Sequence, residues 1–165
     1  LGDVYAHQAA DAYRKALDAY LAEEPFAVDG VWARWEVHSC RIAPLPYQPL
    51  PQPGEPISAT RTHTVIVALD GTDAGAAARR AAVRPAHFER VSGMAANGTL
   101  TMGGAILDDA GAMRGSIVVT RHATDEAARA WMAEDPYMTG GVWTDITLHG
   151  TRFAPLPYRA LPRPA

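Results

Sequence analysis

One long stretch of this chain occurs twice. Residues 23–53 (EEPFAVDGVWARWEVHSCRIAPLPYQPLPQP) reappear as residues 134–164 (EDPYMTGGVWTDITLHGTRFAPLPYRALPRP), at a constant offset of 111 residues and without a gap. Of the 31 paired positions 15 are identical, which chance does not produce over a stretch of mixed composition. The chain therefore contains an internal repeat, and a fold that suits the second copy must also account for the first.

The composition is that of a soluble globular protein. A length of 165 residues fits one domain or two small ones that share a core, and 48% hydrophobic residues are enough to build that core. The net charge is −3 and the basic residues are scattered, so nucleic acid is not an expected partner. No apolar run approaches the roughly 20 residues of a membrane span, and no signal-peptide pattern follows Leu1. We therefore expect a cytoplasmic protein that does not bind membranes.

Nothing in the sequence indicates a metal or an organic cofactor. The single cysteine, Cys40, excludes an intramolecular disulfide and a cysteine-ligated metal cluster. The six histidines show no HxH or HExxH spacing, and the glycine-rich nucleotide-binding motifs and the GxSxG motif are missing. The sequence therefore predicts chemistry without a cofactor.

The second half of the chain has the pattern of a ferredoxin-like α+β fold. Pro85 is expected to begin a helix that runs to Ala96, because a proline inside a helix costs roughly 3 kcal/mol. Thr124 is expected to cap a second helix that ends near Asp135. Strands are expected at Thr62–Leu69, Thr99–Leu107, Gly115–Thr120 and Val142–His149. The resulting order β-α-β-β-α-β predicts an antiparallel sheet with strand order 4-1-3-2.

The first copy matches only the last three of these elements. Gly2–His7 is expected to be a strand, Asp11–Glu23 a helix and Gly30–His38 a strand. In a 4-1-3-2 sheet these two strands are not neighbours, so they need a strand between them from another chain or from a segment before Leu1. The expected organisation is a partial repeat (1–47), a proline-rich linker (48–60), a complete domain (61–153) and a proline-rich arm (154–165).

Topology brings a set of polar residues to one edge of the predicted sheet. The start of the Pro85 helix and the end of the Thr124 helix lie at that edge, so His87 and Asp135 should face a shared cleft. The glycine pair Gly103-Gly104 and Ser116 belong to strand ends at the same edge, and glycines let a ligand approach the backbone. As alternatives, His87 is a core histidine with one hydrogen bond and Asp135 is an ordinary surface turn residue.

Several of these motifs together resemble one known family. The runs VRPAH (83–87), MGGA (102–105), GS (115–116) and EAARAWMAEDPYMTGGVW (126–143) are similar to the YCII-related domain family over Thr62–Phe153, and the end of the family pattern also covers Leu1–Cys40. The resemblance implies a dimeric α/β barrel like that of muconolactone isomerases, in which two ferredoxin-like units pack sheet to sheet.

The resemblance also implies a catalytic histidine–aspartate pair at His87 and Asp135, with a serine at Ser116. In the first copy Glu24 stands at the aspartate position and Asp3 at the serine position, and the histidine has no counterpart. The best-understood enzymatic relatives eliminate halide from a chlorinated hydroxyquinol.

The function predicted from these residues is acid–base catalysis on a small cyclic or aromatic, quinone-like metabolite, by elimination or isomerisation. His87 is the expected general base, and Asp135 is expected to fix its tautomer. The expected substrate-binding residues are Arg84, Gly103, Gly104 and Ser116, and the expected assembly is a homodimer or an intramolecular pseudo-dimer. The alternatives are a module that binds a metabolite or a protein without catalysis, and a cofactor-free monooxygenase.

Overall fold

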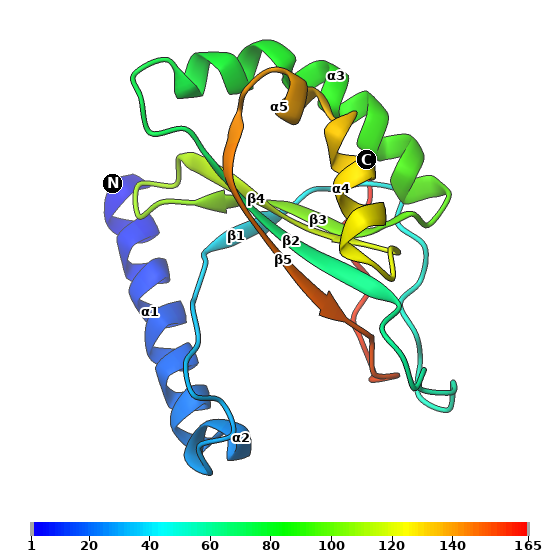
Figure 1. Cartoon of the computed structure of the whole chain (residues 1–165). Coiled ribbons are helices and arrows are strands. Elements are labelled where there is room, and N and C mark those ends of the chain that lie inside the picture. The colour runs from blue at the N-terminus through cyan, green and yellow to red at the C-terminus, as the bar shows by residue number, and fades with distance from the viewer. Residues whose placement is uncertain (1, 165) are drawn as a thin grey trace. The chain divides into compact units, whose positions relative to one another are not determined.

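The computed structural model describes residues 2–164, and the side chains from residue 13 onward. The chain divides into two compact units, one up to Val37 and one from His38 onward. Figure 1 shows the first unit as helices and the second as a sheet with helices packed on it.

The first unit is helical, so both strands expected in it are wrong. Helix α1 spans Gly2–Glu23 and includes the segment expected to be the strand Gly2–His7. Helix α2 (Pro25–Val28) follows, and residues 30–38 contain no strand. The expected helix Asp11–Glu23 lies inside α1.

These residues do not form strands because a β-strand is stable only when its backbone is hydrogen-bonded to a neighbouring strand. Residues 32–40 correspond by the repeat offset to strand β5 (Trp143–Thr151), which is hydrogen-bonded along its length to β2 (His63–Asp70). The first copy has no counterpart of β2, and an unpaired strand is not stable in water. A helix satisfies its backbone within its own residues, and the alanine-rich segment of α1 is a good helix former.

The second unit contains the ferredoxin-like sheet that the sequence predicts. Its strands pair antiparallel in the order β1-β3-β4-β2-β5, where β1 is Cys40–Ile42, β3 is Leu100–Leu107 and β4 is Met113–Thr120. Without β1, this order is the expected 4-1-3-2. The added strand β1 comes from the first copy of the repeat and extends the sheet at the free edge of β3.

Three helices lie on one face of this sheet (Figure 1): α3 (Ala76–Ala96), α4 (Asp125–Ala133) and α5 (Pro136–Thr139). The cap predicted for α4 is present, since the Thr124 hydroxyl accepts the Ala127 N–H at 3.2 Å. Asp135 ends the stretch after α4 and caps α5, because Pro136 keeps the preceding residue out of helical geometry.

The expected start of α3 at Pro85 is wrong. The helix is continuous from Ala76 and carries Pro85 in its interior. A proline there removes one hydrogen bond to the carbonyl of Ala81, but both residues are exposed, so water can solvate that carbonyl. Consequently His87 lies in the middle of a long helix and not in a first turn.

The core lies between the sheet and the helices. In β2 the buried side chains alternate, which places Ile66, Ala68 and finally Asp70 on the face toward α3. The fully apolar part of this core includes Leu100, Val118, Trp131, Met132, Val142 and Trp143. No helix in the described part of the chain is long and apolar enough to cross a membrane.

Candidate active site

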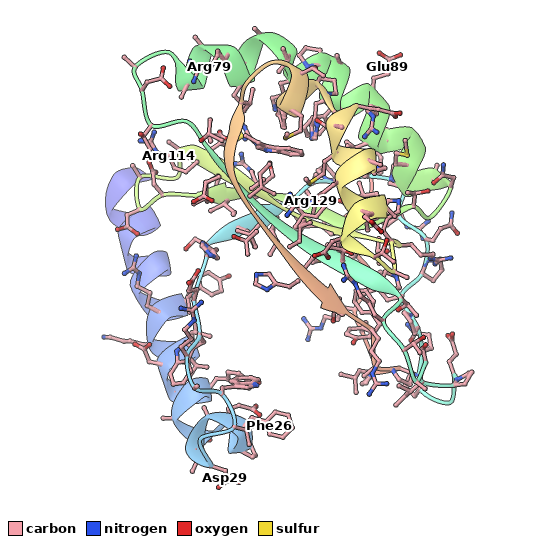
Figure 2. The ribbon with its side chains drawn as sticks, in the orientation of Figure 1. Phe26, Asp29, Arg79, Glu89, Arg114 and Arg129 are labelled. Carbon is pink, nitrogen blue, oxygen red and sulfur yellow. The ribbon has the colours of Figure 1, made fainter. Side chains whose placement is uncertain are left out.

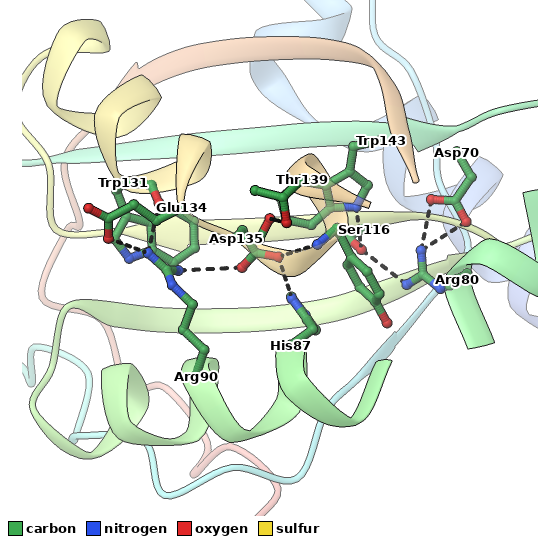
Figure 3. A network of polar contacts seen from close by, with 11 residues as sticks. Asp70, Arg80, His87, Arg90, Ser116, Trp131, Glu134, Asp135, Thr139 and Trp143 are labelled. Carbon is green, nitrogen blue, oxygen red and sulfur yellow. Dashed lines mark hydrogen bonds and ion pairs between the residues drawn. The ribbon is translucent and has the colours of Figure 1, made fainter. Parts of the chain in front are cut away.

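The centre of the site is a hydrogen bond between the two residues that topology predicted to meet. His87 projects from the inner face of α3, and Asp135 caps α5 (Figure 3). Their Nδ1 and Oδ1 atoms are 2.8 Å apart. The Asp135 side chain is fully buried and that of His87 is 10% exposed. An exposed turn aspartate, the alternative for Asp135, is therefore excluded.

The groups around Asp135 are all donors. Its Oδ1 also accepts the backbone N–H of Tyr137 at 2.9 Å, and its Oδ2 is 3.4 Å from Nη1 of Arg90. Arg90 is itself held by the carbonyl of Trp131 at 2.8 Å. A buried carboxylate needs such donors, because an unpaired charge in the interior is costly. With this acceptor on one side, Nδ1 of His87 carries the hydrogen and Nε2 is the basic nitrogen.

Aromatic rings fix the plane of the imidazole. The ring of Tyr137 stacks on His87 at a centroid distance of 3.8 Å and an angle of 18°. Trp143 meets the same ring edge-on at 5.8 Å. Since both rings are buried, His87 has little freedom to rotate, and its Nε2 atom keeps one direction.

A second polar cluster is formed by Arg80, Asp70 and Ser116 (Figure 3). Arg80 forms a buried two-point ion pair with Asp70, with Nη1 at 2.8 and 2.9 Å from the two carboxylate oxygens. Its Nη2 donates to the Ser116 hydroxyl at 3.1 Å, and Nε1 of Trp143 donates to the same oxygen at 3.2 Å. Burial raises the pKa of Asp70, and the attraction of Arg80 opposes that rise. The cluster holds Ser116 as a double acceptor, so its hydrogen remains for another acceptor.

The Tyr137 hydroxyl is buried without a hydrogen-bond partner. Arg80 lies over its ring, with Cζ at 4.5 Å from the centroid. Burial raises the pKa of Tyr137, so the hydroxyl stays protonated and is a donor at neutral pH. A buried polar atom without a partner is rare in proteins and costs free energy.

A cavity of about 210 Å³ connects these groups. Its floor is formed by β3 and β4 and its roof by α3, with the segment 41–45 along one side. The lining is mostly apolar, with a few polar groups that converge on it, as is usual for small-molecule sites. His87, Ser116, Arg84, Gly103 and Gly104 line it, and Asp135 stands behind His87 outside it. The structure thus brings all six residues expected at the site to one place.

The glycine pair in β3 has a further role that the sequence did not indicate. A Cβ on Gly104 would lie 2.7 Å from the carbonyl oxygen of Arg41, so only glycine lets β1 lie so close. The Tyr47 hydroxyl donates to the carbonyl of Gly103 at 2.9 Å and accepts its N–H at 3.1 Å. Part of the open space expected for a ligand is thus occupied by the chain itself.

Sequence reasoning missed Arg80, Asp70, Tyr137 and Trp143. A signal for Arg80 exists: it precedes His87 by seven residues, two turns of the same helix, with Arg84 between them. Because the helix was expected to start at Pro85, Arg80 was not placed on the same helix face as Arg84 and His87. Within the described residues, no group of three or more histidine, cysteine or acidic side chains has an arrangement that could hold a metal ion.

Fold and site together define an α+β protein with a ferredoxin-like sheet and a buried histidine–aspartate pair beside a small cavity. The sequence model of the YCII-related domain matches residues 64–150, and the chain belongs to that family. Protein YciI of Escherichia coli O6:H1 and Protein YciI of Shigella flexneri are each 34% identical over 90 residues, which is 51% of this chain and 90% of theirs.

A weaker likeness is to the 5-chloro-2-hydroxyhydroquinone dehydrochlorinase of Burkholderia phenoliruptrix AC1100, solved with 2,5-dihydroxybenzoquinone. The two chains share 18% identity at a TM-score of 0.45, over 53% of this chain and 90% of the dehydrochlorinase. A likeness at this level does not bear on the chemistry of this chain.

Proposed function

We propose that this protein is a cofactor-independent enzyme in which His87 removes a proton from a small cyclic or aromatic substrate, leading to elimination or isomerisation. The observation that carries the proposal is the 2.8 Å contact of His87 with the fully buried Asp135, at the wall of a cavity of substrate size. Nδ1 is engaged by the carboxylate, which leaves Nε2 for a molecule in the cavity.

The proton transfer needs a base that is oriented before the substrate arrives. Nε2 takes the proton from a substrate carbon, and the imidazolium that forms is stabilised by the Asp135 carboxylate. The electron pair left on carbon then expels a leaving group, or it is reprotonated at another carbon by the same imidazolium. The first course is an elimination and the second an isomerisation, and the site supports both.

Charge that develops on a substrate oxygen needs donors. Ser116 already accepts two hydrogen bonds, so its own hydrogen is free to point to the cavity that it lines. The Tyr137 hydroxyl is protonated and has no partner. Two neutral donors in a mostly apolar pocket favour an enolate or phenolate oxygen over the neutral ketone or phenol.

Exchange of hydrogen with solvent tests this proposal whatever the final product is. A panel of small cyclic enones, unsaturated lactones and hydroquinones is incubated with the protein in D₂O, and loss of C–H signals is followed by proton NMR. We expect the wild type to exchange at least one compound, and His87→Gln to slow that exchange by about 10²-fold or more. Equal exchange by His87→Gln, with an unchanged melting temperature, would overturn the assignment of His87 as base. Binding of compounds without any exchange would indicate a binding module.

A further inference from the structure

The cavity wall carries positive charge that no acidic residue of the wall balances. Three arginines line it, Arg41, Arg80 and Arg84, and no aspartate or glutamate does. Arg80 is neutralised by its buried ion pair with Asp70. Within the described residues, neither Arg41 nor Arg84 is paired with a carboxylate. The net charge that a ligand in the cavity meets is therefore positive.

The two arginines reach the cavity from different parts of the chain. Arg84 is on α3, one turn before His87, and its guanidinium lies over the Phe88 ring at 4.3 Å from the centroid. This contact positions the guanidinium and leaves its N–H groups, which point outward in the plane of the guanidinium, available to an acceptor. Arg41 is in β1, outside the residues 64–150 that match the family model.

The position of Arg41 is set by several contacts of the surrounding segment. β1 pairs with β3 so that Arg41 lies opposite Ala105. Beyond it, Ala43 donates its N–H to the carbonyl of Gly103 at 2.9 Å, and Leu45 is 5% exposed. The segment therefore has a fixed place in the wall, and the first copy of the repeat supplies part of the site of the second.

We propose that the cavity takes a small ring compound that carries a carboxylate, with the anion held by Arg41 and Arg84 and the ring placed beside His87. The location of the ring rests on the proposed function, but the choice of an anion does not. A guanidinium binds a carboxylate through two parallel hydrogen bonds, a geometry that a neutral amide cannot match. The apolar lining between the arginines and His87, including Phe88 and Val91, suits the ring itself.

The test compares two probes of nearly equal shape, benzoate and benzamide, by isothermal titration calorimetry. We expect wild-type protein to bind benzoate more tightly than benzamide. Arg41→Gln and Arg84→Gln should each weaken benzoate binding by about fivefold or more and leave benzamide binding unchanged. The double variant should bind both probes equally. Both arginines are exposed, and melting temperatures verify that the variants fold.

Arg129→Gln is the matched control, because it removes the same charge from an exposed position on α4 that is not part of the wall (Figure 2). It should bind benzoate as the wild type does. Equal binding of the two probes by the wild type, an Arg129→Gln effect as large as that of Arg41→Gln, or no benzoate binding at millimolar concentration would each overturn the proposal.

The same titration on His87→Gln separates this proposal from the proposed function. Benzoate should still bind with a preference over benzamide, since the charges that select it are unchanged. A protein that selects benzoate but exchanges no C–H hydrogen fails the catalytic proposal alone. A protein that exchanges hydrogen but does not prefer benzoate fails this one alone.

Discussion

At the scale of single residues, Asp135 both orients the His87 ring and places a negative charge beside it. One substitution, Asp135→Asn, separates these two effects. The Tyr137 N–H donates to the same Oδ1 that His87 contacts, so in Asp135→Asn the amide oxygen is held in that place. The Nδ1–H tautomer is then retained and only the negative charge is lost. We expect exchange or turnover to fall by about 10²- to 10⁴-fold. The melting temperature should fall as well, because the new amide NH₂ group faces Arg90 and finds no acceptor, so circular dichroism at the assay temperature verifies that the variant is folded.

Glu134→Gln is the control for this charge change, because Glu134 is next in the chain, 79% exposed and not in contact with His87. It should leave activity at the wild-type level. If the two variants lose the same activity, the loss comes from the change in the overall charge of the protein and not from the contact between Asp135 and His87.

The contact of His87 with Asp135 could be predicted from the sequence, although the expected start of α3 was wrong. The topological argument placed the first turn of α3 beside the end of α4, whereas His87 lies in the middle of α3. The two residues meet because Asp135 follows α4 at the start of α5, which packs against α3. The ion pair of Arg80 with Asp70 could not be predicted with the helix starting at Pro85, because Arg80 lies in the part of α3 before Pro85. A proline inside a helix costs free energy, but it does not by itself end the helix. Here the packing of the rest of α3 on the sheet offsets that cost.

At the scale of elements, the attachment of β1 to β3 depends on one glycine. A Cβ at Gly104 would meet the Arg41 carbonyl oxygen at 2.7 Å, whereas a Cβ at Gly103 has its nearest contacts at 3.7 Å, which is ordinary packing. Gly104→Ala should therefore displace β1, cost about 1–3 kcal/mol of stability and weaken benzoate binding. Gly103→Ala should leave β1 in place and stability nearly unchanged.

Hydrogen exchange gives a local measurement of this difference. The Ala43 and Leu107 amides are hydrogen-bonded between the β1 segment and β3, to the carbonyls of Gly103 and Ser39. They should lose protection in Gly104→Ala and keep it in Gly103→Ala. Retained protection in both variants would show that β1 tolerates the added methyl group.

The two copies of the repeat show that similar sequences need not form the same secondary structure. Trp32 and Trp143 occupy equivalent positions in the two copies, yet Trp143 starts β5 and is 4% exposed while Trp32 is in no strand and is 37% exposed. The strands of the second copy were predicted to within a few residues because their partners follow in the same sequence. Residues 2–39 contain no such partners, and similarity to β5 could not supply them.

At the scale of the whole molecule, the dimer or pseudo-dimer expected from the sequence stays a prediction. The first unit exposes large apolar side chains, among them Tyr20, Trp35 and Val37 at 50–57%. Large exposed apolar side chains are typical of protein–protein contact surfaces, which fits the expected dimer.

The pH dependence of stability is a second property of the whole chain. Burial, and then the charge of Arg121, lowers the pKa of His63 from its ordinary value of 6.5, and burial lowers the pKa of His122. Below pH 6.5 these two histidines therefore bind protons in the unfolded chain more readily than in the folded chain. Stability is complete above pH 6.5 and falls as the pH drops toward the folded-state pKa values.

We expect the melting temperature to be level from pH 8 to about pH 7 and to fall between about pH 6.5 and pH 5. His63 is 9% exposed, with Nδ1 at 2.6 Å from the Thr62 hydroxyl, and His63→Gln should make the fall in this window smaller. His149→Gln alters an exposed histidine on the neighbouring strand β5 and is the matched control, because it should leave the curve unchanged. Carboxylates that gain protons below pH 5 add to the loss at lower pH, so the comparison is confined to the window above it. A fall of the same size in His63→Gln and the wild type would mean that His63 is protonated equally easily in the folded and unfolded chains.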